Sequence, residues 1–197
     1  IEFAQFLAQR RRQRGFVREQ PVRTLFGDIV DRCMERDRFG DHRGFFGETY
    51  SQRVYAELGI SENFVQDNHS LSAEIGTVRG LHFQGPPHAQ AKLVRCGRGA
   101  IFDVAVDIRK GSATYGKWVG YELSAENGAQ LFIPAGFAHG FTTLQPDSEI
   151  IYKCSDYYAP ETEGALRWDD PAIDINWPLE GKAILSDKDA VAPILAE

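Results

Sequence analysis

The sequence predicts an all-β protein built as a sandwich or barrel, and three observations support this prediction. Several short runs of strand-forming residues follow one another between residues 77 and 154. Turns that contain glycine or proline separate these runs at close spacing, which is typical of antiparallel β proteins. No helical segment of the length needed to connect parallel strands lies between them, which argues against an α/β sheet.

The chain before residue 77 predicts a turn and a helix. Residues 39–46 hold two glycines around a polar turn and end in aromatic side chains. We expect a helix over residues 51–58, because Ser51 can cap its N-terminus and Gly59 can end it. The prediction is therefore a β domain with a few short peripheral helices.

The main series of strands begins at residue 77. The expected strands are 77–84, 92–96, 101–108, 118–123, 130–133 and 149–154. Gly85-Pro86-Pro87 forms a turn after the first of them. Within 101–108, every second residue from Phe102 to Ile108 is apolar, so these side chains share one face and Asp103 lies on the other.

Composition excludes several classes of protein. The chain has 197 residues, of which 43% are hydrophobic and 25% charged, as in ordinary soluble domains. A net charge of -6 argues against general nucleic-acid binding, which requires a basic surface. The chain has no run of apolar residues long enough to span a membrane, so we expect no membrane contact.

Cysteine usage and the N-terminal composition bear on compartment and domain organisation. The three cysteines are odd in number and widely spaced, which indicates reduced thiols and a cytoplasmic protein. Residues 1–20 are rich in arginine and predict a basic N-terminal arm, either a solvated extension or a segment that binds a partner or an anion. Residues 21–197 then form a single domain.

The strand 77–84 carries the most unusual residues of the chain. Arg79, Gly80 and His82 lie inside it, although glycine and charged residues are depleted in strands. His82 and Arg79 formally point to opposite faces, and Gly80 could mark a β-bulge that turns one of them. Histidine transfers protons near neutral pH, so His82 is a candidate base, with a structural histidine as the alternative.

Three further polar residues lie on expected strands. Tyr152 shares a face with apolar neighbours, and a phenol across a cavity from a base could act as a general acid. Lys92 and Asp103 could also belong to a site. The structural alternatives are a core tyrosine, a solvent-facing lysine and a hydrogen-bonding aspartate, and for Arg79 an ion pair.

Residues 134–139 have the spacing Pro-x-Gly-x-x-His, which is similar to the second half of the cupin signature, where the histidine can bind a metal. The first half requires His-x-His and then a carboxylate, but here Phe83 and Gln84 follow His82. A metal site needs three or four convergent ligands. We therefore expect no metal.

Taken together, the motifs strongly resemble the dTDP-4-dehydrorhamnose 3,5-epimerases, which are cupin-fold enzymes of deoxysugar nucleotide biosynthesis. The matching strings run in order from Phe39 to Ala190 and include FGDHRGFF, VQDNHS, RGLHFQ, KLVRC, FDVAVDIRK, QLFIPAGFAHGF, DYYAP, RWDDPAIDINWPL and SDKDA. The resemblance implies a cupin-type jelly roll, no cofactor, and a dTDP-linked 4-keto-6-deoxyhexose as the substrate.

The resemblance also implies a catalytic role for four residues. His82, assisted by Asp189, corresponds to the base that removes the proton next to the ketone. Tyr152 corresponds to the acid that returns a proton from the opposite face, and Lys92 to the group that holds the enolate oxygen. This division is physically sound, since inversion needs acid and base on opposite sides of the ring.

Substrate binding and assembly follow from the same resemblance. The family is homodimeric, and a segment that corresponds to Arg43 and Glu48 reaches the site from the partner subunit. The expected substrate-binding residues are Arg79, Arg43, Glu48, Gln66, Asn68, His139, Tyr158 and Asp103. The chain departs from the family at Ala91, where glycine is common, and in its charged segment 28–38.

Three alternatives remain open at this point. A mono-epimerase that inverts only C3 or only C5 would keep the same acid and base. A sugar-nucleotide 3,4-ketoisomerase also uses a cupin barrel, but the IYK and DYYAP runs argue against it. A non-catalytic sugar-nucleotide-binding module would have no need of His82, Tyr152 and Asp189 together.

Overall fold

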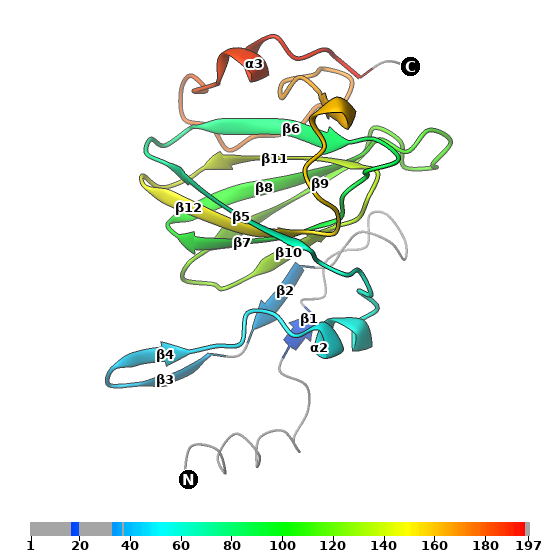
Figure 1. Cartoon of the computed structure of the whole chain (residues 1–197). Coiled ribbons are helices and arrows are strands. Elements are labelled where there is room, and N and C mark those ends of the chain that lie inside the picture. Colours follow the sequence, from blue (N-terminus) through cyan, green and yellow to red (C-terminus); the bar gives the residue numbers. More distant parts are fainter. Residues whose placement is uncertain (1–16, 20–32, 37, 196–197) are drawn as a thin grey trace.

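The computed structural model describes residues 17–19, 33–36 and 38–195, which form two facing antiparallel sheets (Figure 1). The six-stranded sheet has the order β1 (Val17–Glu19), β2 (Cys33–Arg36), β10 (Gln130–Ile133), β7 (Lys92–Arg98), β12 (Ser148–Cys154), β5 (Gln66–Ser72). The five-stranded sheet has the order β13 (Glu163–Ala165), β6 (Val78–Gln84), β11 (Phe137–Thr143), β8 (Ala100–Asp107), β9 (Trp118–Ser124). The predicted fold class, a cupin-type β-sandwich, is confirmed.

The remaining elements are short and peripheral, as predicted. A small hairpin joins β3 (Phe39–Asp41) to β4 (Gly44–Phe46), and η1 (Pro160–Thr162) is a 3₁₀ helix. Helix α2 (Gln52–Glu57) confirms the helix expected at 51–58, although the Ser51 side chain makes no capping hydrogen bond. Ser186 is the N-cap of helix α3 (Asp187–Ala190), and its side chain accepts a hydrogen bond from the Asp189 N–H.

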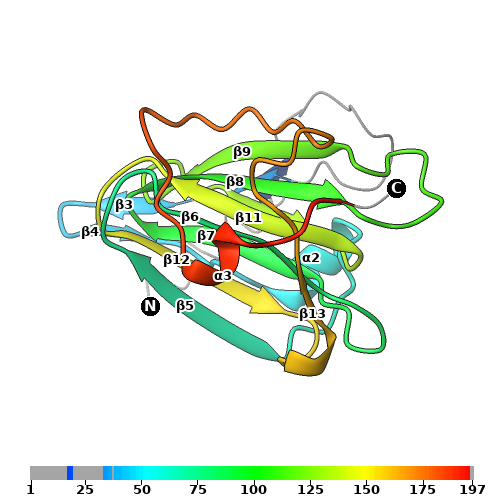
Figure 2. The same cartoon turned by 90° about the horizontal axis from the view of Figure 1, so that it is seen from above.

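The core has three layers of apolar contacts. The central layer lies between the sheets and includes Val94, Ile101, Leu131, Phe141 and Ile150. The C-terminal segment covers the outer face of the five-stranded sheet, while α2 lies at the opposite side of the sandwich (Figures 1 and 2). Strands β8 and β11 are therefore buried on both faces.

Burial on both faces explains one gap in the sequence-based strand prediction, which also lacked the half-exposed strand β5. Every residue of β11 is buried, so the strand lacks the alternation of a half-exposed strand and was not predicted. Val104 and Val106 pack under the C-terminal segment, as their shared apolar face predicts. Asp103, on the other face of β8, is also fully buried.

The expected arm, residues 1–20, lies outside the described residues apart from β1. In the part of the chain that the structure describes, no helix is long and apolar enough to cross a membrane.

A β-bulge at Gly80 shapes the pairing of β6 with β11. His82 pairs with His139 and Arg79 pairs with Phe141, so Gly80 and Leu81 together oppose the single residue Gly140. Gly80 has a φ of 113°, and a Cβ there would lie 2.6 Å from the carbonyl oxygen of His139. Only glycine fits both this backbone conformation and this close approach.

We expect Gly80→Ala to lower the free energy of unfolding by more than about 2 kcal/mol, because the methyl group would meet backbone atoms that cannot move independently. Gly111→Ala is the matched control, since Gly111 also has a positive φ but a Cβ added there would have no atom within 4 Å. That control should cost about 1 kcal/mol. Urea denaturation measures both, and equal losses would contradict the proposed clash.

Candidate active site

A cavity of about 840 Å³ is lined by residues of both sheets. Strands β5, β7 and β12 contribute from one sheet and β6, β11 and β13 from the other, and residues 184–186, 188 and 189 add part of the C-terminal segment. Nine of the expected site residues line this cavity: Gln66, Asn68, Arg79, His82, Lys92, His139, Tyr152, Tyr158 and Asp189. The fold thus gathers residues that are more than a hundred positions apart.

His82 and Asp189 form a close pair. The distance from His82 Nε2 to Asp189 Oδ1 is 2.6 Å, and the side chains are 32% and 4% exposed. Short helix α3 presents the carboxylate, and the Gly80 N–H lies 3.5 Å from its second oxygen. A carboxylate on one ring nitrogen fixes the tautomer and leaves the other nitrogen free to accept a proton.

Tyr152 enters the cavity from the opposite sheet. It lies on β12, directly across from Asn68 on β5, and its ring centroid is 6.5 Å from that of His139 on β11. Burial raises the pKa of the Tyr152 hydroxyl, and a hydrogen bond with Asn68 acts in the opposite direction. The phenol therefore stays protonated and can donate a proton.

Lys92, at the start of β7, is only 9% exposed and lines the same cavity. Burial lowers the pKa of Lys92, although nearby negative groups such as Asp103 and Glu163 oppose the change. A cation held out of water interacts strongly with an oxyanion that forms beside it.

A second histidine–aspartate pair lies beside the first, and its histidine is the cross-strand neighbour of His82. His139 Nε2 is 2.7 Å from Asp103 Oδ1, and the two side chains are 8% and 0% exposed. Burial lowers the pKa of His139, while Asp103 raises it. Asp103 does not line the cavity, and its Oδ2 has no hydrogen-bond partner within the described residues. This geometry favours a role for Asp103 in orienting His139 over a direct contact between Asp103 and the substrate.

Arg79 lies at the cavity wall with much of its side chain exposed. Its Nε donates to Ser72 Oγ at 3.0 Å and one terminal nitrogen donates to the Leu71 carbonyl at 3.1 Å. A guanidinium has five N–H donors, so others remain for an anionic ligand.

Arg43 and Glu48 do not reach this cavity within one chain. Arg43 lies in the β3–β4 turn, where it pairs with Asp41 and its side chain is 74% exposed. Glu48 lines a separate small cavity of about 170 Å³. Their expected entry into a partner subunit's site stays a prediction.

Other residues of the cavity were missed by the sequence analysis. Lys188 Nζ is 2.7 Å from Glu163 Oε2, and the Tyr158 hydroxyl donates to the same oxygen at 3.1 Å. Gln84 also lines the cavity. Lys188 could have been suggested by its position next to Asp189, but Glu163 and Gln84 carry no comparable sequence pattern.

The described ranges, residues 17–19, 33–36 and 38–195, contain no group of three His, Cys, Asp or Glu side chains that could hold a metal ion. A paired histidine, a phenol from the opposite sheet and a buried ammonium group together suit proton transfer next to a carbonyl group. A β-sandwich with this site defines an acid–base isomerase.

Comparison with known proteins identifies the family. The family model for dTDP-4-dehydrorhamnose 3,5-epimerase matches residues 29–197, and the chain belongs to this family. A curated dTDP-4-dehydrorhamnose 3,5-epimerase from Sinorhizobium fredii is 59% identical over 81% of this chain and 82% of the relative.

Solved structures agree with the sequence comparison. The dTDP-4-dehydrorhamnose 3,5-epimerase of Bacillus anthracis, with TDP and PPi bound, has a TM-score of 0.81 at 50% identity and covers 83% of this chain and 93% of its own. The Legionella pneumophila enzyme, in complex with dTDP-4-keto-L-rhamnose, has a TM-score of 0.82 at 46% identity, with 91% and 92% covered. A 3'-monoepimerase from Streptomyces bikiniensis is more distant, at 34% identity and a TM-score of 0.79, with 84% and 85% covered.

We expect Lys92→Met to stabilise the fold while impairing turnover. Methionine fills a similar volume without a buried charge, so the free energy of unfolding at pH 7 should rise by about 1 kcal/mol. Loss of the oxyanion partner should lower kcat about a hundredfold or more. Exposed Lys117 provides the control, Lys117→Met, which should leave both quantities nearly unchanged. A less stable Lys92→Met protein would show that the ammonium group is well solvated in its cavity.

Proposed function

We propose that this protein inverts C3 and C5 of a dTDP-4-keto-6-deoxyhexose and gives dTDP-4-keto-L-rhamnose or a related sugar. One observation carries the proposal: the His82–Asp189 pair and Tyr152 face the same cavity from opposite sheets. A hydrogen removed from one side of a ring and returned from the other side inverts the carbon.

The reaction uses the acidity of carbons that flank a ketone. His82 accepts the proton from C3 or C5, and the C–H electron pair moves into the ring to form an enolate with its charge on the C4 oxygen. Lys92 stabilises that oxygen, and Asp189 stabilises the resulting imidazolium. Tyr152 then donates its proton to the opposite face of the carbon, and the ketone forms again. Each proton lost by the sugar is replaced, so no oxidant or reductant is needed.

Polar residues at the cavity wall bind the nucleotide. The unused donors of Arg79 suit a diphosphate, whose oxygens match a planar guanidinium. Gln66, Asn68, His139 and Tyr158 complete the contacts that we expect with the substrate. The relatives solved with TDP and PPi or with dTDP-4-keto-L-rhamnose support this ligand class.

We also propose a homodimer that acts in the cytoplasm. Phe45 and Phe46 on the β3–β4 hairpin are 64% and 53% exposed, as expected for a segment covered by a second subunit. A dimer would allow Arg43 and Glu48 to act in the partner subunit's site. Cys33, Cys96 and Cys154 are buried thiols, which suits a reducing compartment.

Inversion at a single carbon is the second candidate, because the same acid and base serve it. The structural relative that is a 3'-monoepimerase shares the fold at lower identity than the 3,5-epimerases reported above.

Turnover of the 4-keto sugar in D₂O should place deuterium at both C3 and C5, since the proton that Tyr152 donates comes from solvent. NMR spectroscopy of the product measures both positions. Deuterium at one carbon alone would replace the proposal with a mono-epimerase, and deuterium at neither carbon would show that the protein does not epimerise this sugar.

Paired variants should separate the base from the acid. We expect His82→Ala to lower turnover by at least about a hundredfold and to abolish deuterium exchange, because no base remains to remove the proton. Tyr152→Phe should lose inversion to a similar extent but retain exchange on the side of His82. Tyr115→Phe, outside the cavity, is the control for loss of a hydroxyl. Equal loss of exchange and inversion in Tyr152→Phe would assign the acid to another residue.

A further inference from the structure

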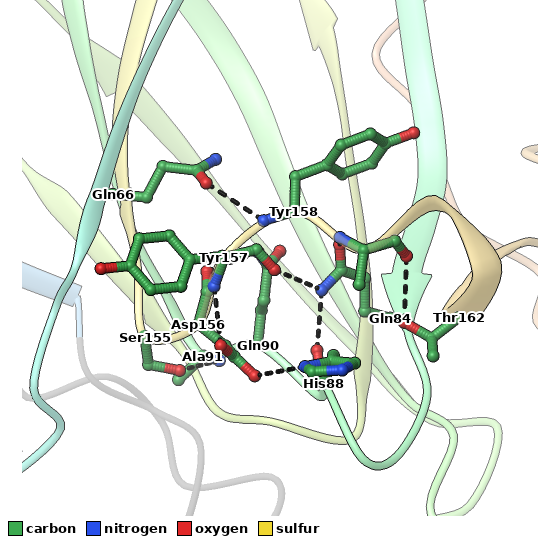
Figure 3. Close-up of polar contacts among 11 residues, drawn as sticks. Gln66, Gln84, His88, Gln90, Ala91, Ser155, Asp156, Tyr157, Tyr158 and Thr162 are labelled. Carbon is green, nitrogen blue, oxygen red and sulfur yellow. Dashed lines mark hydrogen bonds and ion pairs between the residues drawn. The ribbon is translucent and has the colours of Figure 1, made fainter.

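Two chain segments are joined by a hydrogen-bond network at the rim of the cavity (Figure 3). One runs from the last residue of β6 and spans residues 84–91, and the other follows β12 and spans residues 155–162. His88 Nδ1 lies 3.1 Å from Asp156 Oδ2, and Gln90 Nε2 donates to the Asp156 carbonyl at 2.8 Å. The Ala91 N–H donates to Ser155 Oγ at 2.8 Å. The network therefore fixes the second segment against the end of strand β6.

Gln84 is at the centre of this network and is only 6% exposed. Its Nε2 donates to the His88 carbonyl at 2.7 Å and to the Tyr157 carbonyl at 3.2 Å. Its Oε1 accepts from the Ala159 N–H at 2.9 Å. Both ends of the amide are used, so the orientation of the side chain is specified and a carboxylate cannot replace it.

The partners of Gln84 lie on both sides of Tyr158. Gln84 holds the carbonyl group of Tyr157, which comes just before Tyr158, and the N–H group of Ala159, which comes just after it. Tyr158 itself is 57% exposed, yet it lines the cavity. Its own N–H donates to Gln66 Oε1 at 3.1 Å. Without Gln84, the peptide group before Tyr158 would keep only its hydrogen bond to Gln66, and the N–H of the peptide group after Tyr158 would lose its partner.

We propose that Gln84 is a positioning residue for substrate binding, which holds Tyr158 at the cavity rim in the conformation that packs against the bound sugar nucleotide. The inference rests on the proposed function, because it takes the contents of the cavity to be a sugar nucleotide. Gln84 makes no hydrogen bond to His82, Asp189, Lys92 or Tyr152. Its loss should therefore weaken binding and leave the chemical step intact.

Gln84→Glu is the sharpest variant, since it keeps the size of the side chain and turns a donor of two hydrogen bonds into an acceptor that faces two carbonyl oxygens. We expect KM for the 4-keto sugar to rise on the order of tenfold while kcat stays within about twofold. The matched control is Gln145→Glu on an exposed turn, which adds the same charge and should change neither constant.

A double-mutant cycle with Tyr158→Ala distinguishes positioning from a general structural role. If Gln84 acts through Tyr158, adding Gln84→Glu to Tyr158→Ala should raise KM by less than about threefold. A full, additive rise in KM, or a fall in kcat equal to the rise in KM for the single variant, would overturn the proposal.

Binding of dTDP-glucose, measured by calorimetry, keeps this test separate from the proposed function. This ligand lacks the ketone and cannot react, so a wild-type protein that binds it without turning over the keto sugar would refute the function alone. We then expect Gln84→Glu to weaken dTDP-glucose binding on the order of tenfold. If Gln84→Glu does not fold, Gln84→Met is measured in its place. Failure of both variants to fold would make Gln84 a stability residue and overturn the proposal.

Discussion

The close approach of β6 and β11 at Gly80 is the constraint on which the site depends. Alternation along a regular strand would turn Arg79 and His82 to opposite faces. The bulge adds one residue to β6, and both side chains then line one cavity. The same glycine leaves room for the His139 carbonyl and presents its own N–H toward Asp189. Backbone packing, more than any side-chain contact, therefore brings the candidate base and the candidate anion ligand together.

Burial of polar groups inside the sandwich lowers the stability of the fold. The strands that form the central apolar layer also carry Lys92, Asp103 and His139, and all three are buried. Burial works against the charged forms of Lys92 and His139, as the direction of their pKa changes shows. Polar groups kept out of water destabilise a fold unless each is fully paired, but they bind a developing charge more strongly. The incomplete pairing of Asp103 is consistent with a site selected for chemistry at the expense of stability.

Much of the fold followed from the sequence because most strands here are short, strand-forming and bounded by glycine or proline. Strand β11 was missed since its seven residues are buried on both faces and include glycine and histidine. The nine cavity residues were found through motifs whose residues are far apart in the chain. Glu163 and Gln84 escaped because their importance lies in tertiary partners, Lys188 and the backbone around Tyr158, which local sequence does not encode.

The cavity thus has two parts that are held by different means. His82, Lys92 and Tyr152 lie on β6, β7 and β12, where the hydrogen bonds between strands fix their backbone. Asp189 lies on helix α3 and is hydrogen-bonded directly to His82. The aromatic rim lies on a segment with little regular structure, and side-chain amides hold its backbone instead. A strand cannot shift without disrupting its sheet, whereas a loop held by four side-chain amide contacts can be altered locally. Within one fold, the chemical step can therefore stay constant while changes at the rim alter which sugar nucleotide is bound.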